Sequence, residues 1–179
     1  MPRDVIRKVE RELLARADLV FTTSTTLQKA CSKINPACHY FPNVVNYDHF
    51  ATARDPGHIP EDLHNIPHPR IGFIGAISEY KFDIPLVSRV AQLRTDWHWV
   101  LIGDVGEGHP DTASYLLHAP NIHLMGPRPY ASLPEYLRGF DAAVIPAPLN
   151  DYTSAMFPMK FFEYLAAGCP VVTTKLQSL

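Results

Sequence analysis

The hydrophobic positions along the chain change their spacing several times, and each change predicts the end of one element and the start of another. Over residues 5–17, apolar side chains recur every three to four positions among charged ones, which predicts an amphipathic helix. A short strand is expected within 17–24, a helix over 25–33 and a second strand within 38–45. Residues 46–70 are rich in His, Pro, Asp and Asn and predict a loop with at most one short helix.

From residue 70 onward, apolar strands alternate regularly with amphipathic segments. The expected strands are 70–76, 98–104, 121–126, 141–147 and 169–174. The expected helices are 83–93, 111–119, 132–140 and the segment that begins near residue 156. Strands that alternate with helices of this length are typical of βαβ units, so we predict an α/β fold with a Rossmann-like, doubly wound parallel sheet.

Two helix starts in this region have recognisable caps. Asp83 can cap the helix that runs to Leu93, and Ser132 can cap the next one, with Glu135 three residues later as in a capping box. The first of these helices should turn its regularly spaced apolar residues inward, namely Ile84, Leu86, Val87, Val90 and Leu93.

Ligands of such sheets lie at the carboxyl ends of the strands. Here those ends carry Gly75, Gly103, Gly126, Pro146 and Thr173 with Thr174. Glycine allows a phosphate to approach the backbone closely. However, the stretch "GFIGAISEY" is not a GxGxxG fingerprint, which makes a nicotinamide-dependent oxidoreductase a distant alternative.

The segment "MFPMKFFEYLAAGCPVVTT", residues 156–174, places Lys160 and Glu163 on an otherwise apolar helix. Two interpretations are open at this point. The helix can be a scaffold element with two solvated charges, or it can present a carboxylate to a ligand.

The composition of the chain argues against several classes of protein. The chain has 179 residues, 46% of them hydrophobic and 19% charged, and a net charge of −2, which indicates a globular protein and not a nucleic-acid binder. It has neither an apolar run of membrane-spanning length nor a signal-peptide stretch. Three cysteines without paired spacing predict free thiols, and nine scattered histidines predict no metal site.

Four ordered stretches resemble the C-terminal domain of GT-B glycosyltransferases. The first is "FPNVVNYDHF", which is similar to the hinge that opens that domain. The second is "IGFIGAISEYKFDIPLV", which is similar to its first strand, glycine loop and helix. The others are "NIHLMGPRPYASLPEYLRGFDAAVIP" and "PMKFFEYLAAGCPVVTT". The resemblance is to the retaining, nucleotide-sugar-dependent group 1 or family four transferases, mainly bacterial in this form, and covers residue 17 to the end.

The resemblance implies roles for particular residues. Glu163 occupies the position of the glutamate that binds the donor ribose hydroxyls, as a carboxylate can accept from both. Lys81 follows the glycine loop where the family has a diphosphate-binding lysine, which makes it the candidate catalytic residue because it would stabilise the departing diphosphate without a metal. Lys160 is a further candidate phosphate ligand, and Gly75 would let the diphosphate approach.

The remaining candidate donor-binding residues lie in two loops. Gly126 and Tyr130 belong to a segment expected near the base, where Tyr130 either stacks or packs and Arg128 is a loop cation. Ser154 and Met156 belong to a segment before the helix whose backbone amides could meet sugar or phosphate.

Two positions depart from the family pattern. Ala155 stands where many relatives have a glutamate that contacts the donor sugar, and Ala76 stands where many have an arginine beside the lysine. The missing sugar contact could come from Asn150, Asp151 or Thr153, and the sequence does not choose among them.

The resemblance also implies a domain division. Residues 1–41 correspond to the end of the N-terminal, acceptor-side Rossmann-like domain, and residues 42–179 to a truncated nucleotide-sugar-binding domain, so we expect a fragment that is inactive alone. The parent enzyme would transfer a sugar from a UDP- or GDP-sugar to a glycan or lipid-linked envelope acceptor, bound through the missing domain, with neither metal nor cofactor. It would act in the cytoplasm or peripherally at the inner face of the membrane.

Other functions remain open from the sequence. One is a GT-B sugar-nucleotide epimerase, whose usual catalytic acids are not identifiable here. Another is a non-catalytic nucleotide-binding or interaction domain, which Ala76 and Ala155 favour.

Overall fold

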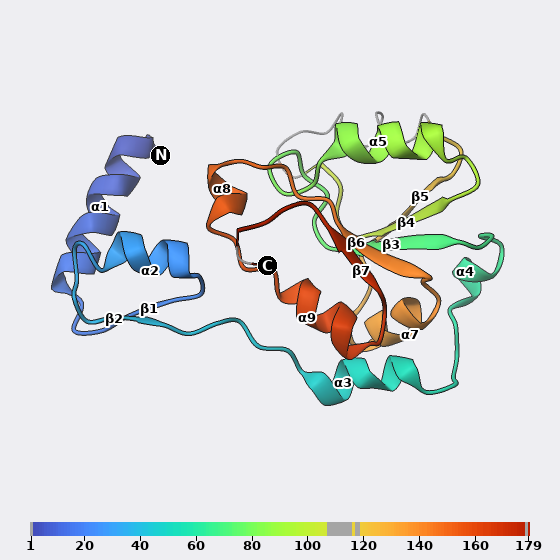
Figure 1. Cartoon of the computed structure of the whole chain (residues 1–179), viewed down its shortest axis with the longest axis horizontal. Helices are drawn as coiled ribbons and strands as arrows, with labels where there is room; N and C mark the ends of the chain where they lie inside the picture. Colours follow the sequence, from blue (N-terminus) through green and yellow to red (C-terminus); the bar gives the residue numbers. More distant parts are fainter. Residues whose placement is uncertain (1, 107–115, 117–118, 178) are drawn as a thin grey trace.

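The computed structural model describes residues 2–106, 116, 119–177 and 179 and contains two parallel sheets (Figure 1). The larger sheet has five strands in the order β5-β4-β3-β6-β7, and every neighbouring pair is parallel. Its strands are β3 (Arg70–Ile74), β4 (His98–Ile102), β5 (Ile122–Gly126), β6 (Ala142–Ile145) and β7 (Val171–Thr173). The predicted doubly wound α/β fold is therefore confirmed.

Helices cover both faces of this sheet, because its strands are apolar on both sides. The face shown uppermost in Figure 1 carries α5 (Ile84–Leu93). The opposite face carries α3 (Tyr47–Ala51), α7 (Leu133–Arg138) and α9 (Met159–Ala166). The remaining short elements are η1 (Thr52–Arg54), α4 (Glu61–His64), η2 (Tyr130–Ser132) and α8 (Asp151–Ser154).

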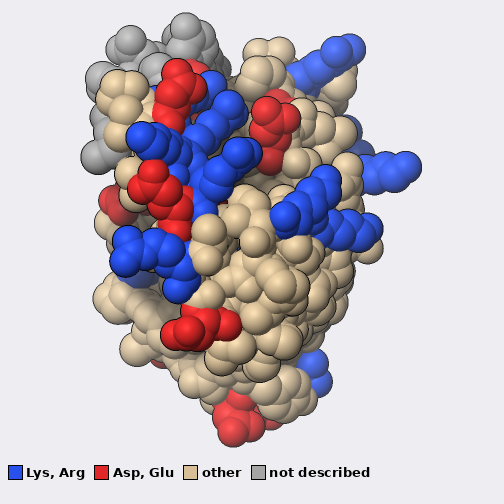
Figure 2. Space-filling model, turned by 90° about the vertical axis from the view of Figure 1, so that its left-hand side faces the viewer, with Lys and Arg blue, Asp and Glu red and all other residues tan. Residues whose placement is uncertain are grey.

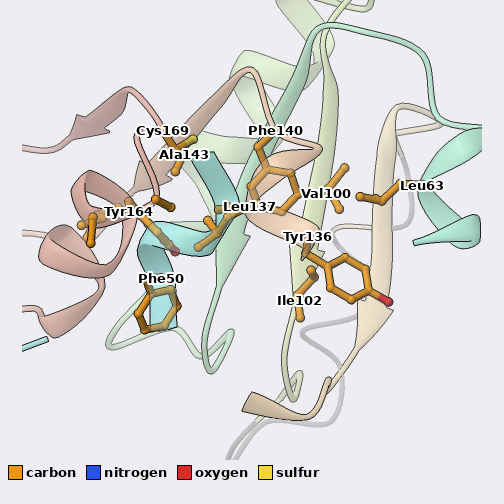
Figure 3. Close-up of a cluster of buried hydrophobic side chains, with 14 of the residues drawn as sticks. Phe50, Leu63, Val100, Ile102, Tyr136, Leu137, Phe140, Ala143, Tyr164 and Cys169 are labelled. Atoms are coloured by element: carbon orange, nitrogen blue, oxygen red, sulfur yellow. The ribbon is translucent and has the colours of Figure 1, made fainter. Parts of the chain in front are cut away.

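The core divides into two clusters, one on each face of the sheet. Alternate strand residues face opposite sides, so Val100 and Ile102 join one cluster while Trp99 and Leu101 join the other. Figure 3 shows the first cluster, in which Phe50 of α3 and Tyr164 of α9 pack below the sheet with side chains from α7. Burial on both faces explains why the strands appear in the sequence as continuous apolar runs.

The smaller sheet is formed by the N-terminal residues. It pairs β1 (Val20–Thr22) with β2 (Cys38–Tyr40) in parallel, and α1 (Arg3–Arg16) and α2 (Thr25–Cys31) accompany it. Asn35 holds the end of α1 in place through its amide nitrogen, which donates to the carbonyls of Leu14 and Ala17 at 2.9 and 2.7 Å. The predicted domain boundary at 41/42 falls in the segment that joins the two sheets and stays a prediction.

Most predicted elements appear within a few residues of their expected limits. Asp83 caps α5 as predicted, since its carboxylate accepts from the amide of Leu86 at 2.9 Å. The predicted helix over 111–119 lies almost wholly outside the described residues. The three cysteines are free, as predicted. Within the described part of the chain, no helix is long and apolar enough to cross a membrane.

Three expectations were wrong. Ser132 occupies the N-cap position of α7, but the expected capping hydrogen bond of its side chain is absent, because its hydroxyl donates to the carbonyl of Pro129 at 2.9 Å. Leu86 and Leu93 of α5 are 39% and 71% exposed instead of facing inward. Residues 46–70 contain three short helical elements where at most one was expected, held by contacts that are distant in sequence.

Candidate functional site

The candidate site lies where two neighbouring strands diverge. β3 pairs with β6 only at Ile71 and Gly72, whereas it stays paired with β4 as far as Ile74. The chain winds outward in opposite directions from β3 and β6, so this is the switch point at which open α/β sheets bind ligands. A pocket of about 230 Å³ opens there, lined by Phe73, Ala76, Lys81, Ile145, Tyr152, Met156, Pro158 and Lys160. The predicted residues Lys81, Met156 and Lys160 are thus brought together, and we call this the switch-point pocket.

Gly75 lies directly beside this pocket, at the carboxyl end of β3. Its amide donates to the carbonyl of Ile102 at 2.8 Å, and its φ angle of +149° is rarely adopted by L side chains. A Cβ atom here would lie 2.8 Å from the Nζ atom of Lys160. Glycine is therefore needed for the lysine to lie over this turn, where the ammonium is also 5.5 Å from the ring centre of Phe73.

The charges of the site influence one another. Burial lowers the pKa of Lys160, Glu163 opposes that shift, and the nearby Lys81 adds to it. Burial likewise raises the pKa of Glu163, against the influence of Lys160 and His49. Two lysines and one carboxylate thus share a partly desolvated region, where an anion would be held more strongly than at an open surface.

Helix α9 positions Lys160 and Glu163, which lie one turn apart on it. Tyr164 anchors the helix to the sheet, because its fully buried hydroxyl accepts from the amide of Ile74 at 2.9 Å. Arg54 of η1 binds the same C-terminal part of the helix by donating from Nε and Nη2 to the carbonyls of Ala166 and Leu165, at 2.7 and 2.9 Å. The C-terminal part of α9 is therefore tied both to the sheet and to η1.

Gly126 and Tyr130 belong to the edge strand β5 and to the short helix η2 that follows it. Gly126 ends β5 with a φ of +70°, and its carbonyl accepts from the amide of Gly103 at 3.0 Å. The half-exposed ring of Tyr130 stacks on His49 with centroids 4.6 Å apart and planes 16° apart. Because His49 also influences Glu163, it connects the Tyr130 region with α9.

Ser154 does not line the switch-point pocket. Its hydroxyl donates to the carbonyl of Asp151 at 2.8 Å within α8. Among the alternatives for the sugar contact, Asn150 and Thr153 form a reciprocal capping box, and the Thr153 side chain is fully buried. Of these three residues, Asp151 has the exposed carboxylate.

Arg128 has a structural role. Its Nη2 lies 2.8 Å from the carboxylate of Asp62, and its Nε donates to the hydroxyl of Tyr136 at 2.6 Å. The cation therefore ties the loop after β5 to α4 and α7.

Sequence reasoning missed two residues that support the site. One is His49, and the other is Asn43, whose side-chain amide donates to the carbonyl of Phe157 at 2.7 Å, just before α9. Both belong to the stretch "FPNVVNYDHF", so the motif contained them, but their partners are far away in the sequence.

Two other features contain none of the candidate donor-binding residues. A cavity of about 560 Å³ lies between α5 and strands β3, β4, β6 and β7 and is lined mainly by apolar side chains. It shares Ile145 with the switch-point pocket and reaches the strand ends at Pro146, Thr173 and Thr174. His98 and His123 form a pair with ring nitrogens 3.1 Å apart. No cluster of three or more metal-ligating side chains occurs among the described residues.

Comparison with known proteins identifies a family of glycosyltransferases. Residues 68–179 match the family described as "Glycosyl transferases group 1". The chain is also 32% identical over 182 residues to TuaH of Bacillus subtilis (strain 168), which is named as a glycosyltransferase of teichuronic acid biosynthesis. That alignment covers 98% of this chain and 45% of TuaH.

Solved structures share the fold. HepE of Anabaena, determined with UDP and glucose, superimposes with a TM-score of 0.75 at 18% identity, over 98% of this chain and 49% of HepE. Sucrose-phosphate synthase of Thermosynechococcus elongatus gives 0.72 at 20% identity, over 98% of this chain and 45% of the synthase. The chain thus spans about half the length of the relatives that it matches.

Proposed function

Because the chain belongs to the group 1 glycosyltransferases, we propose that it supplies the donor-binding half of an enzyme that transfers a sugar from a nucleotide sugar to a glycan. The observation that carries this proposal is the convergence of Lys81 and Lys160 on one pocket at the strand switch point, with Glu163 one turn further along α9.

In the proposed complex, Glu163 accepts hydrogen bonds from the two ribose hydroxyls of the donor. Lys160 and Lys81 face the diphosphate, which approaches the backbone at Gly75. As the bond between sugar and diphosphate breaks, negative charge grows on the departing phosphate, and two nearby ammonium groups stabilise it. We propose that this charge lets the enzyme work without a metal ion, and that transfer retains the anomeric configuration, as in the family that the sequence resembles.

We propose a UDP-sugar as the donor. HepE, which shares the fold, was determined with UDP and with UDP-glucose. Tyr130 and the backbone near Gly126 are the groups proposed to meet the base. TuaH is named for teichuronic acid biosynthesis, which supports a polysaccharide of the cell envelope as the product.

A non-catalytic nucleotide-binding domain is the second candidate. Ala76 lines the switch-point pocket where many relatives have an arginine, so one charge expected beside the diphosphate is absent. The two functions differ in turnover. Release of UDP from UDP-sugar that requires an acceptor, by a protein containing this chain together with its acceptor-binding half, would support the transferase.

The donor site can be tested on the chain itself by calorimetric titration with UDP, GDP, ADP and dTDP. We expect UDP to bind, and Glu163→Gln to bind it at least about tenfold more weakly, since glutamine lacks the negative charge and has one acceptor oxygen instead of two at this partly buried position. The matched control is Glu61→Gln, which removes an exposed carboxylate from α4. Equal UDP affinity in both variants would contradict the role of Glu163, and absence of binding by any of the four nucleotides would contradict the donor site.

A further inference from the structure

We propose that the cleft between α1 and α8 binds an anionic saccharide, which is the acceptor of the transfer proposed above, and the inference therefore rests on that function. The cleft has a volume of about 480 Å³ and is lined by Arg3, Ile6, Arg7, Tyr80, Asn150, Asp151 and Tyr152. It joins the two parts of the molecule, because its first three lining residues come from α1 and the others come from the region of the larger sheet. Figure 1 shows the first turns of α1 beside α8.

The α1 wall of the cleft is cationic. Arg3 and Arg7 lie one turn apart, so their side chains extend from the same face of the helix. No hydrogen bond or ion pair engages either guanidinium among the described residues. Two such groups can each bind a carboxylate or phosphate through paired N–H donors.

The opposite wall is aromatic and firmly held. The rings of Tyr80 and Tyr152 meet edge to face, with centroids 5.2 Å apart. Asn150 stabilises this pair by donating from its side-chain amide to the carbonyl of Tyr80 at 3.1 Å, while the same residue caps α8. The rings are 39% and 49% exposed, and flat rings of this kind suit the apolar C–H face of a sugar.

The remaining polar lining group is the exposed carboxylate of Asp151, which can accept from sugar hydroxyls. A ligand that satisfies both walls must combine hydroxyls, an apolar ring face and a negative charge. A neutral sugar leaves the arginines without an anion, and a simple inorganic anion makes no use of the tyrosines.

The position of the cleft explains why its ligand would be the acceptor. Tyr152 lines both this cleft and the switch-point pocket. The ammonium of Lys81 lies 4.8 Å from the centre of the Tyr80 ring, so the aromatic wall borders the proposed diphosphate site. A saccharide on this wall would thus lie beside the sugar end of the donor.

The charges around α1 argue against a general surface for anions. Figure 2 views the side of the molecule that carries α1 and shows its basic side chains interleaved with acidic ones. Asp4, Glu10 and Glu12 are the acidic residues of this helix. A membrane or a long polyanion would meet these carboxylates as well, whereas a short saccharide inside the cleft meets Arg3 and Arg7.

The test is calorimetric titration of the chain, saturated with UDP, with trigalacturonic acid, its neutral methyl ester and a glycerol-phosphate oligomer. We expect trigalacturonic acid to bind, and the ester to bind at least about tenfold more weakly, since it keeps the sugar and loses the charge. Binding of the glycerol-phosphate oligomer in place of the uronate would contradict the proposal, because that oligomer has negative charge but no sugar ring for the tyrosines.

Variants separate the cleft from the rest of the helix. We expect the double variant Arg3→Gln with Arg7→Gln to weaken saccharide binding about tenfold or more and to leave UDP affinity unchanged. Tyr152→Ala should also weaken saccharide binding. The matched control is Arg11→Gln with Arg16→Gln, because it removes the same two charges from exposed positions outside the cleft on the same helix. The proposal would be overturned if trigalacturonic acid and its methyl ester bind with equal affinity, if the control variant loses as much saccharide affinity as the cleft variant, or if tripolyphosphate binds as strongly as the saccharide. If the wild-type chain does not bind UDP, the result contradicts the donor site instead.

Discussion

Substitution of Tyr164 by phenylalanine should destabilise the protein by a predictable amount, because this hydroxyl completes the edge of a strand. Beyond Gly72, β6 no longer pairs with β3, so the amide of Ile74 has no strand partner on that side. The hydroxyl of Tyr164 accepts from that amide at 2.9 Å and also lies 3.4 Å from the carbonyl of the same residue. Phenylalanine fills the same space and leaves both backbone groups without their partner.

The size of the stability loss follows from the backbone groups of Ile74 that lose their partner. Loss of the hydrogen-bond partner of the Ile74 amide, which is partly buried, should cost about 1–3 kcal/mol. With a urea dependence of about 1–3 kcal/mol per molar, the unfolding midpoint should fall by about 1 M. Since α9 also carries Lys160 and Glu163, UDP affinity should fall together with stability.

The assay is urea unfolding followed by circular dichroism, with Tyr40→Phe as the matched control. The hydroxyl of Tyr40 makes no hydrogen bond within the described residues, so its removal should leave the midpoint unchanged. If both variants unfold at the same urea concentration, the hydroxyl of Tyr164 does not support the strand edge, and the account of how α9 is positioned fails.

Three further predictions concern the site and its surroundings. Glu163→Gln should raise the midpoint of thermal unfolding at neutral pH. Burial raises the pKa of this carboxyl, so the wild type loses stability as pH rises through the range between the ordinary and the raised value, and the gain should vanish in acid. Gly75→Ala should cost about 1–3 kcal/mol in urea unfolding and weaken UDP binding, because a Cβ at a φ of +149° would meet Lys160; unchanged values would refute the close approach. Asp141→Asn should lower the free energy of unfolding at neutral pH and leave it unchanged in acid. Burial favours a raised pKa for Asp141, but hydrogen bonds from the Arg70 amide and from His68 outweigh it and lower that pKa, so the stability that the carboxylate contributes is lost as pH falls. A pH-independent difference would contradict that assignment.

The large sheet was predictable because its information is local. The central strands β3, β4 and β6 are buried on both faces and appear as apolar runs, and the helices between the strands fix the parallel direction. The resemblance to group 1 glycosyltransferases implied that Lys81 and Lys160 both face the donor phosphates, and the structure brings the two side chains to one pocket. By contrast, the sequence marks Leu86 and Leu93 as apolar but does not show how far neighbouring elements cover α5.

The helices in residues 46–70 could not be predicted for a different reason. Their stability comes from partners distant in the chain, such as Phe50, which packs into the core formed by α7 and α9. The role of His49 likewise depends on the ring of Tyr130 and on Glu163. The helix propensity of the residues themselves does not reveal such contacts.

The arginines that hold residues 47–64 also determine where the molecule can bend. Arg54 binds the carbonyls at the end of α9, and Arg138 of α7 donates to the carbonyls of Thr52, Asp55 and His58, so this stretch moves as one body with the larger sheet. A rotation of the smaller sheet would then be concentrated in the backbone torsions of residues 41–46. Asn43 lies within this connecting segment, and its side-chain amide donates to the carbonyl of Phe157, just before α9. A rotation at this connecting segment would therefore shift the start of the helix that carries Lys160 and Glu163, and so couple the movement of the smaller sheet to the proposed nucleotide site.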